Sequence, residues 1–155
     1  MQVYLFLNRK MKAVVQRVKR TILKVNNEVV SEIPYGLAVY LGVGESDTFE
    51  NATYLAKKIA KLRIFEDENG KMNLSVQDVG GEILSISQFT LYADVSHGNR
   101  PSFTLAKEPI TAEKIYDYFC EQLKENGVIV KKGVFGADMK IEQYNDGPVT
   151  IIYEV

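Results

Sequence analysis

Apolar and polar residues alternate along residues 11–25, and this two-residue period is typical of a half-buried β-strand. One side of the predicted strand carries Ala13, Val15 and Arg17, and the other carries Val14, Gln16 and Val18. The pair Asn26–Asn27 follows, which favours a hairpin turn into a second strand. Residues 37–43, LAVYLGV, are a continuous apolar run and predict a central strand buried on both faces.

Two later segments show the 3.6-residue period of an amphipathic helix. The first spans residues 49–60, and the spacing of Asp47 and Glu50 resembles a capping box, so the helix is expected to start at residues 46–47. In the second helix Thr111 is the expected N-cap and Gly127 the left-handed stop. Its apolar stripe consists of Ile115, Tyr118, Phe119 and Leu123.

The rest of the chain is predicted to be strands and turns. Residues 66–70, EDENG, form a turn, and the expected strands are residues 73–76, 82–92, 128–135, 139–144 and 149–155. The chain has no internal repeat, low-complexity stretch or linker. The predicted fold is one strand-rich α+β domain with two main helices.

Composition and charge narrow the function. The 155 residues suit about one domain, and 46% apolar with 25% charged residues is ordinary for a globular protein. No apolar run approaches the ~18 residues of a membrane span. The net charge of −1 argues against a protein that grips long stretches of nucleic acid, so any such contact is expected to be local. Lys57, Lys58 and Lys61 lie off the apolar stripe, and two interpretations stay open: a solvated helix face, or a contact with RNA phosphates.

Counting reactive side chains excludes several sites. His97 and Cys120 are the single histidine and cysteine, so the chain cannot build a zinc site from several of either. The chain has no phosphate-binding loop, dinucleotide fingerprint, nucleophile elbow or HExxH motif. Cys120 and His97 could pair as nucleophile and base, but Cys120 is expected to be a buried hydrophobe and His97 a solvated loop residue. One cysteine fits a reducing compartment.

Residues 1–10, MQVYLFLNRK, lack the order of a signal peptide, which has basic residues first and a longer apolar region. The regular pattern begins at Met11. We therefore expect residues 1–10 to be an N-terminal extension and residues 11–155 to form the domain.

Two polar segments are candidates for a site. Residues 87–103, SQFTLYADVSHGNRPSF, run from a strand into a loop, and the hydroxyl and amide groups of Ser87, Gln88 and Thr90 could orient a substrate. Residues 145–150, NDGPVT, have the composition of a turn between two strands. The pattern does not decide whether the Gly147–Pro148 bond is cis.

From Met11 onward the chain resembles the D-aminoacyl-tRNA deacylases. The matching segments, in order, are MKAVVQRV at 11–18, LRIFED at 62–67, SQFTLYAD at 87–94, GNRPSF at 98–103, FGADM at 135–139 and NDGPVT at 145–150. The resemblance implies a barrel-like, mostly antiparallel domain that hydrolyses the ester of D-aminoacyl-tRNA and of glycyl-tRNA and spares L-aminoacyl-tRNA. It also implies a cytoplasmic homodimer with active sites at the interface, no metal, no cofactor and no membrane.

The same resemblance assigns roles to residues. Ser87, Gln88, Phe89 and Thr90 would line the pocket for the aminoacyl-adenosine end and carry catalysis. Gly147 and Pro148 match a Gly-cis-Pro motif that enters the neighbouring subunit's pocket, where its carbonyls receive the substrate's α-amino group. Ala137 and Met139 would flank that pocket. Arg100 would lie near the acceptor stem or be solvated, and Ser96–His97 stand where many relatives carry basic residues.

Thr90 has two candidate roles. Its hydroxyl could be the nucleophile, but no base is visible beside it, so we favour an orienting role with assistance from the ribose 2′-hydroxyl. Two other functions stay open: a non-catalytic nucleic-acid-binding module on the same fold, and a hydrolase of small D-amino acid esters or peptides.

Overall fold

The computed structural model describes residues 10–155, and strand β1 (Lys12–Val25) pairs with three other strands of the main sheet. Antiparallel neighbours of β1 are β2 (Glu28–Ile33), β3 (Gly36–Gly42) and β8 (Lys140–Glu154). Asn26 and Asn27 connect β1 to β2 with φ of 51° and 65°, the left-handed pair that a tight hairpin turn needs. The predicted hairpin and the predicted buried strand at β3 are confirmed.

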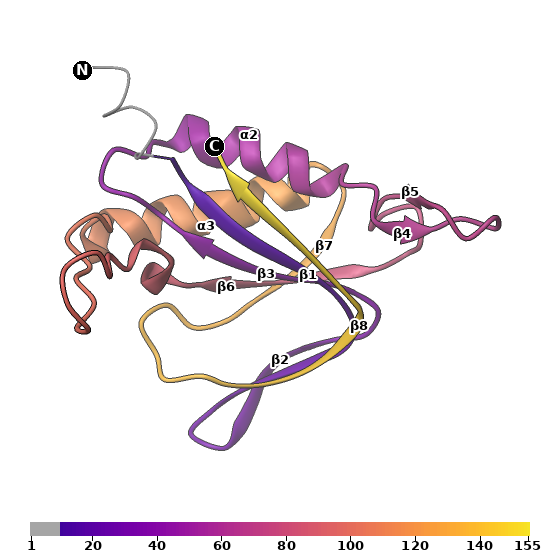
Figure 1. Ribbon diagram of the computed structural model, residues 1–155. Helices are drawn as coiled ribbons and strands as arrows, with labels where there is room; N and C mark the ends of the chain where they lie inside the picture. The colour runs from indigo at the N-terminus through magenta and orange to yellow at the C-terminus, as the bar shows by residue number, and fades with distance from the viewer. Residues whose placement is uncertain (1–9) are drawn as a thin grey trace.

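The main sheet has the strand order β2-β1-β3-β6-β7, and β8 also pairs with β1 (Figure 1). Strands β6 (Glu82–Ser87) and β7 (Ile129–Lys132) join it by parallel pairing. Strands β4 (Phe65–Glu66) and β5 (Met72–Leu74) form a separate antiparallel pair. Most pairings are therefore antiparallel, as expected, although the β3–β6–β7 part of the sheet is parallel.

Helices α2 (Phe49–Ala60) and α3 (Pro109–Glu125) pack side by side against one face of the sheet. Both helices exist as predicted, but their N-caps differ. Thr48, not Asp47, caps α2 and forms a capping box with Asn51. Glu108, not Thr111, caps α3, because its carboxylate accepts from the N–H groups of Ile110 and Thr111. Gly127 has φ of 89° and ends α3 as expected.

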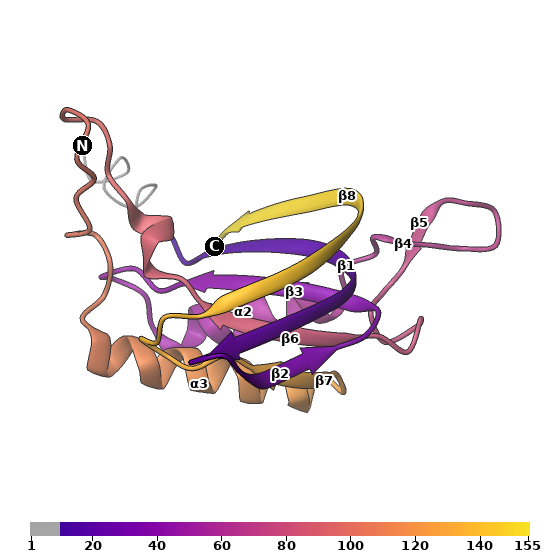
Figure 2. The same cartoon turned by 90° about the horizontal axis from the view of Figure 1, so that it is seen from below.

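The sheet curls until it is almost closed, so the molecule has two apolar cores. The larger core lies between the helices and β1, β3 and β6, and the smaller one is enclosed where β1 and β8 bend over the sheet (Figure 2). Buried members of the smaller core are Val18, Leu23, Ile33, Ala38, Leu84 and Ile86. The hydroxyl of Ser31 on β2 donates to the Lys132 carbonyl on β7, and Lys131 Nζ donates to the Glu32 carbonyl at 2.9 Å. These contacts join the two outer strands, as a barrel-like fold requires.

Two strand predictions are wrong. The strand expected at residues 82–92 ends at Ser87, and Phe89–Tyr92 form the short 3-10 helix η1. The strands expected at residues 139–144 and 149–155 are one continuous strand, β8. The Asn-Asp-Gly-Pro segment is not a turn between strands, because residues on both sides of it pair with β1.

Residues 1–9 lie outside the described residues, and with them almost all of the predicted extension. Within residues 10–155, no helix combines the length and the apolar composition needed to cross a lipid bilayer. Cys120 is fully buried in the larger core and His97 is exposed in a loop, so the two predictions for them are confirmed and they do not pair.

Asp47 is a buried carboxylate that couples stability to pH. Its Oδ2 accepts from the Gly44 N–H at 2.6 Å and lies 3.1 Å from the Tyr92 hydroxyl, but its Oδ1 has no partner. Burial raises the pKa of Asp47 to about 6, above the unfolded value of about 3.9. Between these two pKa values the folded state holds a proton that the unfolded state releases, so the free energy of unfolding falls as the pH rises through this window.

Asp47→Asn is expected to remove this fall, which is on the order of 2 kcal/mol between about pH 4 and pH 7. The asparagine keeps an oxygen for the Gly44 N–H and cannot ionise. Urea unfolding at pH 4.5, 5.5 and 7 measures the difference from the parent chain. The control is Asp138→Asn, because Asp138 is a surface carboxylate with 85% of its side chain exposed. An unchanged pH profile in Asp47→Asn would contradict the assignment.

Candidate active site

The end of β6 positions the first predicted site segment. Gln88 donates its backbone N–H to the Leu41 carbonyl of β3 at 2.7 Å, and the chain then turns into η1. Gly42 permits this turn, because a Cβ there would lie 3.1 Å from both the Gln88 carbonyl oxygen and Leu91 Cβ. Phe89 and Thr90 are the first residues of η1, so no carbonyl within the helix accepts from their N–H groups.

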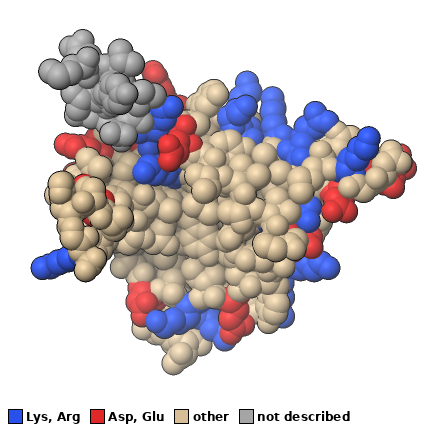
Figure 3. Space-filling view, in the orientation of Figure 1, with Lys and Arg blue, Asp and Glu red and all other residues tan. Residues whose placement is uncertain are grey.

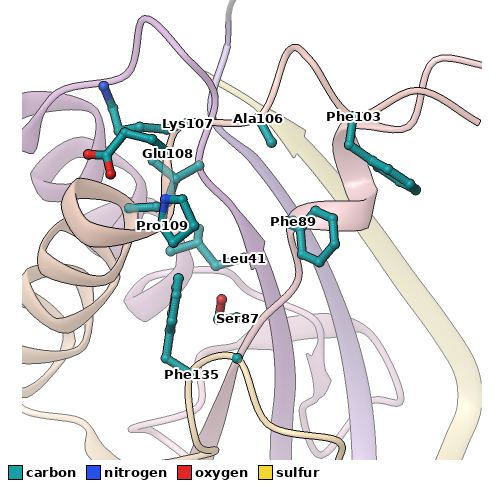
Figure 4. A pocket seen from close by; sticks show the side chains of 12 residues that line it. Leu41, Ser87, Phe89, Phe103, Ala106, Lys107, Glu108, Pro109 and Phe135 are labelled. Atoms are coloured by element: carbon teal, nitrogen blue, oxygen red, sulfur yellow. The ribbon is translucent and has the colours of Figure 1, made fainter.

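Two adjoining cavities open around Ser87, and Figure 4 shows the larger one. Their volumes are about 350 Å³ and about 240 Å³, and both are lined by Ser87, Phe89, Phe135 and Gly136. Figure 4 shows the Ser87 side chain between the rings of Phe89 and Phe135. The Phe89 ring is 56% exposed and packs edge-on against Phe103, with ring centroids 5.2 Å apart. The arrangement offers a small polar group between aromatic walls, which suits a ligand with a flat ring and an adjacent polar end.

The larger cavity extends toward the start of α3. Leu41, Val43, Ala106, Pro109 and Ala112 make its far wall mostly apolar, and Lys107 and Glu108 stand at its rim. The smaller cavity extends the other way, toward Gln88, Ala137 and Met139. Five predicted site residues on two segments therefore line the two cavities: Ser87, Gln88 and Phe89 on one, Ala137 and Met139 on the other. Phe135 and Gly136 belong to the same site but were missed, although they stand in the same FGADM segment.

Thr90 is exposed and lines neither cavity. Its hydroxyl accepts a hydrogen bond from the Gln88 side-chain amide. An amide cannot take a proton from a threonine, so this contact orients the hydroxyl without activating it. Within residues 10–155, no group of three or more His, Cys, Asp or Glu side chains is arranged to hold a metal ion.

Gly147 and Pro148 form an irregularity inside β8. The register with β1 shifts between Gln16, which pairs with Thr150, and Val18, which pairs with Asn145, so β8 residues 146–149 bulge out of the ladder. A second shift, between Val18 and Arg20, leaves the extra residue on β1. The Gly147–Pro148 peptide bond is cis, and Gly147 has φ of 127°. Both residues are exposed, and neither lines the two cavities of its own chain.

Arg17 on β1 anchors this bulge of β8. Its side chain is buried, and its Nε donates to the Asp146 carbonyl at 3.1 Å and lies 3.3 Å from the Asp146 carboxylate. Its Nη1 donates to the Ile64 carbonyl at 2.7 Å. Sequence reasoning placed Arg17 on the same side as Ala13 and Val15 without seeing its role. A cation on an apolar strand face was the available signal, because a buried charge needs partners.

The loop with Arg100 is separate from both cavities. It closes through the paired residues Asp94 and Ser102, and the Asp94 carboxylate accepts from the N–H and the hydroxyl of Ser96. These contacts lower the pKa of Asp94. Arg100 is exposed on this loop and lines neither cavity.

Comparison with solved structures defines the fold. The chain superposes on a probable eukaryotic D-amino acid tRNA deacylase with a TM-score of 0.81 at 19% identity, covering 94% of this chain and 100% of that one. It also matches the c-Myc DNA Unwinding Element Binding Protein with a TM-score of 0.87 at 45% identity, covering 93% and 98%. The predicted barrel-like α+β fold is thus shared with both of these solved structures.

Sequence comparison defines the family. The model of the D-Tyr-tRNA(Tyr) deacylase family matches residues 14–154. The D-aminoacyl-tRNA deacylase of Geobacillus sp. (strain WCH70) is 56% identical over 93% of this chain and 95% of its own length. That of Bacillus cytotoxicus is 51% identical over 93% and 99%. The chain belongs to the D-Tyr-tRNA(Tyr) deacylase family, so the resemblance predicted from its motifs is confirmed.

Proposed function

We propose that this chain hydrolyses the ester bond between a D-amino acid and the terminal adenosine of tRNA, releasing free tRNA and the amino acid. The observation that carries the proposal is its 56% identity, over 93% of its length, to a protein named D-aminoacyl-tRNA deacylase. The cavities around Ser87 support it, because a purine ring and an adjacent ester match aromatic walls with a central polar group.

The proposed chemistry rests on orientation. An aminoacyl ester is already reactive, so the enzyme mainly holds the ester and stabilises the developing oxyanion. Ser87 and Gln88 position the substrate, and the free N–H groups of Phe89 and Thr90 are the oxyanion donors. Thr90 helps to orient the substrate through its hydrogen bond with the Gln88 side chain. The ribose 2′-hydroxyl of the tRNA assists the attack of water on the ester. No triad is needed for this route.

The proposed selectivity comes from a second subunit. In a homodimer, the exposed Gly147 and Pro148 enter the partner's pocket and their carbonyls receive the substrate's α-amino group. With the ester and amino group fixed, an L side chain meets the wall near Ala137 and Met139, whereas a D side chain points to solvent. Glycine has no side chain to reject, so glycyl-tRNA is also a substrate. Arg100 lies toward the acceptor stem, and the reaction takes place in the cytoplasm.

Hydrolysis of D-tyrosyl-tRNA and L-tyrosyl-tRNA by the purified protein, with EDTA present, tests the proposal. We expect release from the D form at least 100-fold faster than from the L form, since a steric clash of a few kcal/mol gives this ratio. A free D-tyrosine ethyl ester is the control, because a hydrolase of small esters would cleave it without the tRNA 3′ end. Equal rates on both tRNA substrates, or none on either, would contradict the proposal.

A second candidate is a nucleic-acid-binding module without catalysis. One observation favours it: a 45% identical solved structure is named as a protein that binds a DNA unwinding element. This function predicts a steep dependence of binding on salt and no effect of Gly147–Pro148 substitutions on affinity. Absence of hydrolysis together with tight, salt-dependent binding would establish it over the deacylase.

A further inference from the structure

A basic hollow lies at the C-terminal end of α2. Its volume is about 500 Å³, and it is lined by Tyr54, Lys57, Lys58, Lys61, Leu62, Arg63 and Tyr153. Four of these side chains are cationic and none is anionic. Figure 3 shows Lys and Arg gathered along the edge of the molecule where α2 lies in Figure 1. A local charge of this size stands out in a chain whose net charge is −1.

The three lysines of the hollow have no acidic partner. Seven ion pairs join side chains of residues 10–155, and none of them includes Lys57, Lys58 or Lys61. Arg63 donates to the neutral Asn73, and it also lies near the Asp78 carboxylate, whose pKa is lowered chiefly by hydrogen bonds from Ser75 and further by the charge of Arg63. The exposed face of α3 differs, because there Lys124 pairs with Glu121 and Asp117 pairs with Lys132. A cluster of three lysines without an ion pair therefore lies at the C-terminal end of α2.

The shape and charge of the hollow favour binding of a polyanion whose charged groups stand out in a row. Three mobile ammonium groups and a guanidinium match a row of phosphates, and the exposed Tyr54 adds an aromatic ring beside them. A lipid surface fits less well, because most apolar residues of α2 (Ala52, Leu55, Ala56, Ile59 and Ala60) are buried in the core, and the exposed Phe49 is at the opposite end of the helix from the hollow.

We propose that the basic hollow binds the phosphate backbone of the tRNA acceptor helix while the 3′ end occupies the cavities around Ser87. This inference rests on the proposed function. Helix α2 follows β3 and runs back along the sheet, so its 12 residues carry the hollow roughly 18 Å from the end of β3 that borders the cavities. With the 3′ end of the tRNA in the cavities, a hollow at this distance lies beyond the single-stranded end of the substrate and beside its helical stem.

The test compares two pairs of lysines on two helices. The variant Lys57→Gln/Lys58→Gln removes two charges from the hollow, and Lys114→Gln/Lys124→Gln removes two exposed charges from α3. Lys124 is in the last turn of α3, as Lys57 and Lys58 are in that of α2, so the control includes one of the two helix-dipole effects on stability. Lys57→Arg/Lys58→Arg keeps the charge.

Binding of uncharged tRNA is measured against salt concentration. We expect Lys57→Gln/Lys58→Gln to reduce the slope of log K against log salt by about 2 and to weaken binding at least 10-fold at low salt. The α3 variant and the arginine variant should match the parent chain. With D-tyrosyl-tRNA the loss should lie in KM, and a D-tyrosylated CCA trinucleotide should be cleaved at the parent rate.

An unchanged slope and KM in Lys57→Gln/Lys58→Gln would overturn the inference, and so would an equal loss in the α3 variant. Tighter binding of the parent chain to anionic vesicles than to tRNA, lost in the same variant, would assign the hollow to a membrane instead and also overturn it. Failure of the parent chain to cleave either substrate counts against the proposed function alone, since tRNA binding still tests the hollow.

Discussion

Arg17→Ala is expected to lower kcat/KM for D-tyrosyl-tRNA at least 100-fold and the free energy of unfolding by about 3–5 kcal/mol. The guanidinium ties the Asp146 carbonyl and carboxylate on β8 to the Ile64 carbonyl before β4. Without it, a half-buried carboxylate loses its partner and the Gly147–Pro148 bulge loses its anchor. Arg17→Lys keeps the charge but cannot reach both carbonyls, so an intermediate loss is expected. Single-turnover hydrolysis and urea unfolding measure the two effects.

The matched control is Arg20→Ala, which removes a neighbouring arginine from the same strand. Arg20 pairs with Glu32, and its side chain is 53% exposed, so the expected loss of stability is below about 1 kcal/mol with activity retained. If Arg17→Ala remained folded and fully active, the bulge would not depend on this anchor, and the proposed role of Gly147 and Pro148 would lose its support.

Mixing two inactive variants tests whether Gly147 and Pro148 act in the cavity of their own chain or in that of the partner subunit. Ala137→Trp fills the smaller cavity, of about 240 Å³, and should be inactive by itself. A mixed dimer with Arg17→Ala has one site made of an intact cavity and an intact bulge. Statistical mixing should therefore restore about a quarter of the parent activity if Gly147 and Pro148 act in the partner's pocket. No recovery, with dimers present, would contradict that arrangement.

Replacing the terminal adenosine by its 2′-deoxy form is expected to lower the rate on D-tyrosyl-tRNA by 10²–10⁴, the usual contribution of a positioned proton-transfer group. Thr90→Ala should cost less than about 10-fold, because the Thr90 hydroxyl touches the Gln88 amide and no base. Quench-flow measurements on both substrates with both proteins give the comparison.

Thr90→Ser is the control that distinguishes the two mechanisms. A nucleophilic hydroxyl would survive in serine, so inactivity of Thr90→Ala with activity of Thr90→Ser would make Thr90 the nucleophile. A normal rate on the 2′-deoxy substrate would also contradict substrate assistance. The expected pattern is that both Thr90 variants remain active and both depend on the 2′-hydroxyl.

The local pattern of apolar and polar residues was sufficient to predict the helices and strands in which buried residues recur at a regular helix or strand spacing. The two helices and the β1–β2 hairpin are where the pattern predicted them. It failed where distant pairing decides the conformation. The Asn-Asp-Gly-Pro segment has turn composition, yet β1 holds both sides of it in one strand. Phe89–Tyr92 have strand-like composition, yet Gly42 on another strand lets them coil into η1.

The candidate site, like the fold, was predictable in part: local motifs identified some of its residues, but contacts between distant segments did not follow from them. Motif resemblance predicted that Ser87, Gln88 and Phe89 share a pocket with Ala137 and Met139, and in the structure these residues line two adjoining cavities, while their roles stay a prediction. It could not show that Thr90 and Arg100 stand outside those cavities. The cation on an apolar strand face shows that Arg17 needs partners, but those partners, Asp146 and Ile64, are remote in sequence, so the local pattern does not identify them.

The pairing of β1 with β8 also sets an order for folding on the ribosome. β2 and β3 can cover one edge of β1 early, but the other edge waits for β8, whose Glu154 lies opposite Lys12. Until then β1 exposes an unpaired edge, and the smaller core lacks the Met139 and Ile141 side chains that pack against it. Nascent chains are therefore open to edge-to-edge association for most of synthesis, and a chaperone that shields a bare strand would act before the last strand emerges.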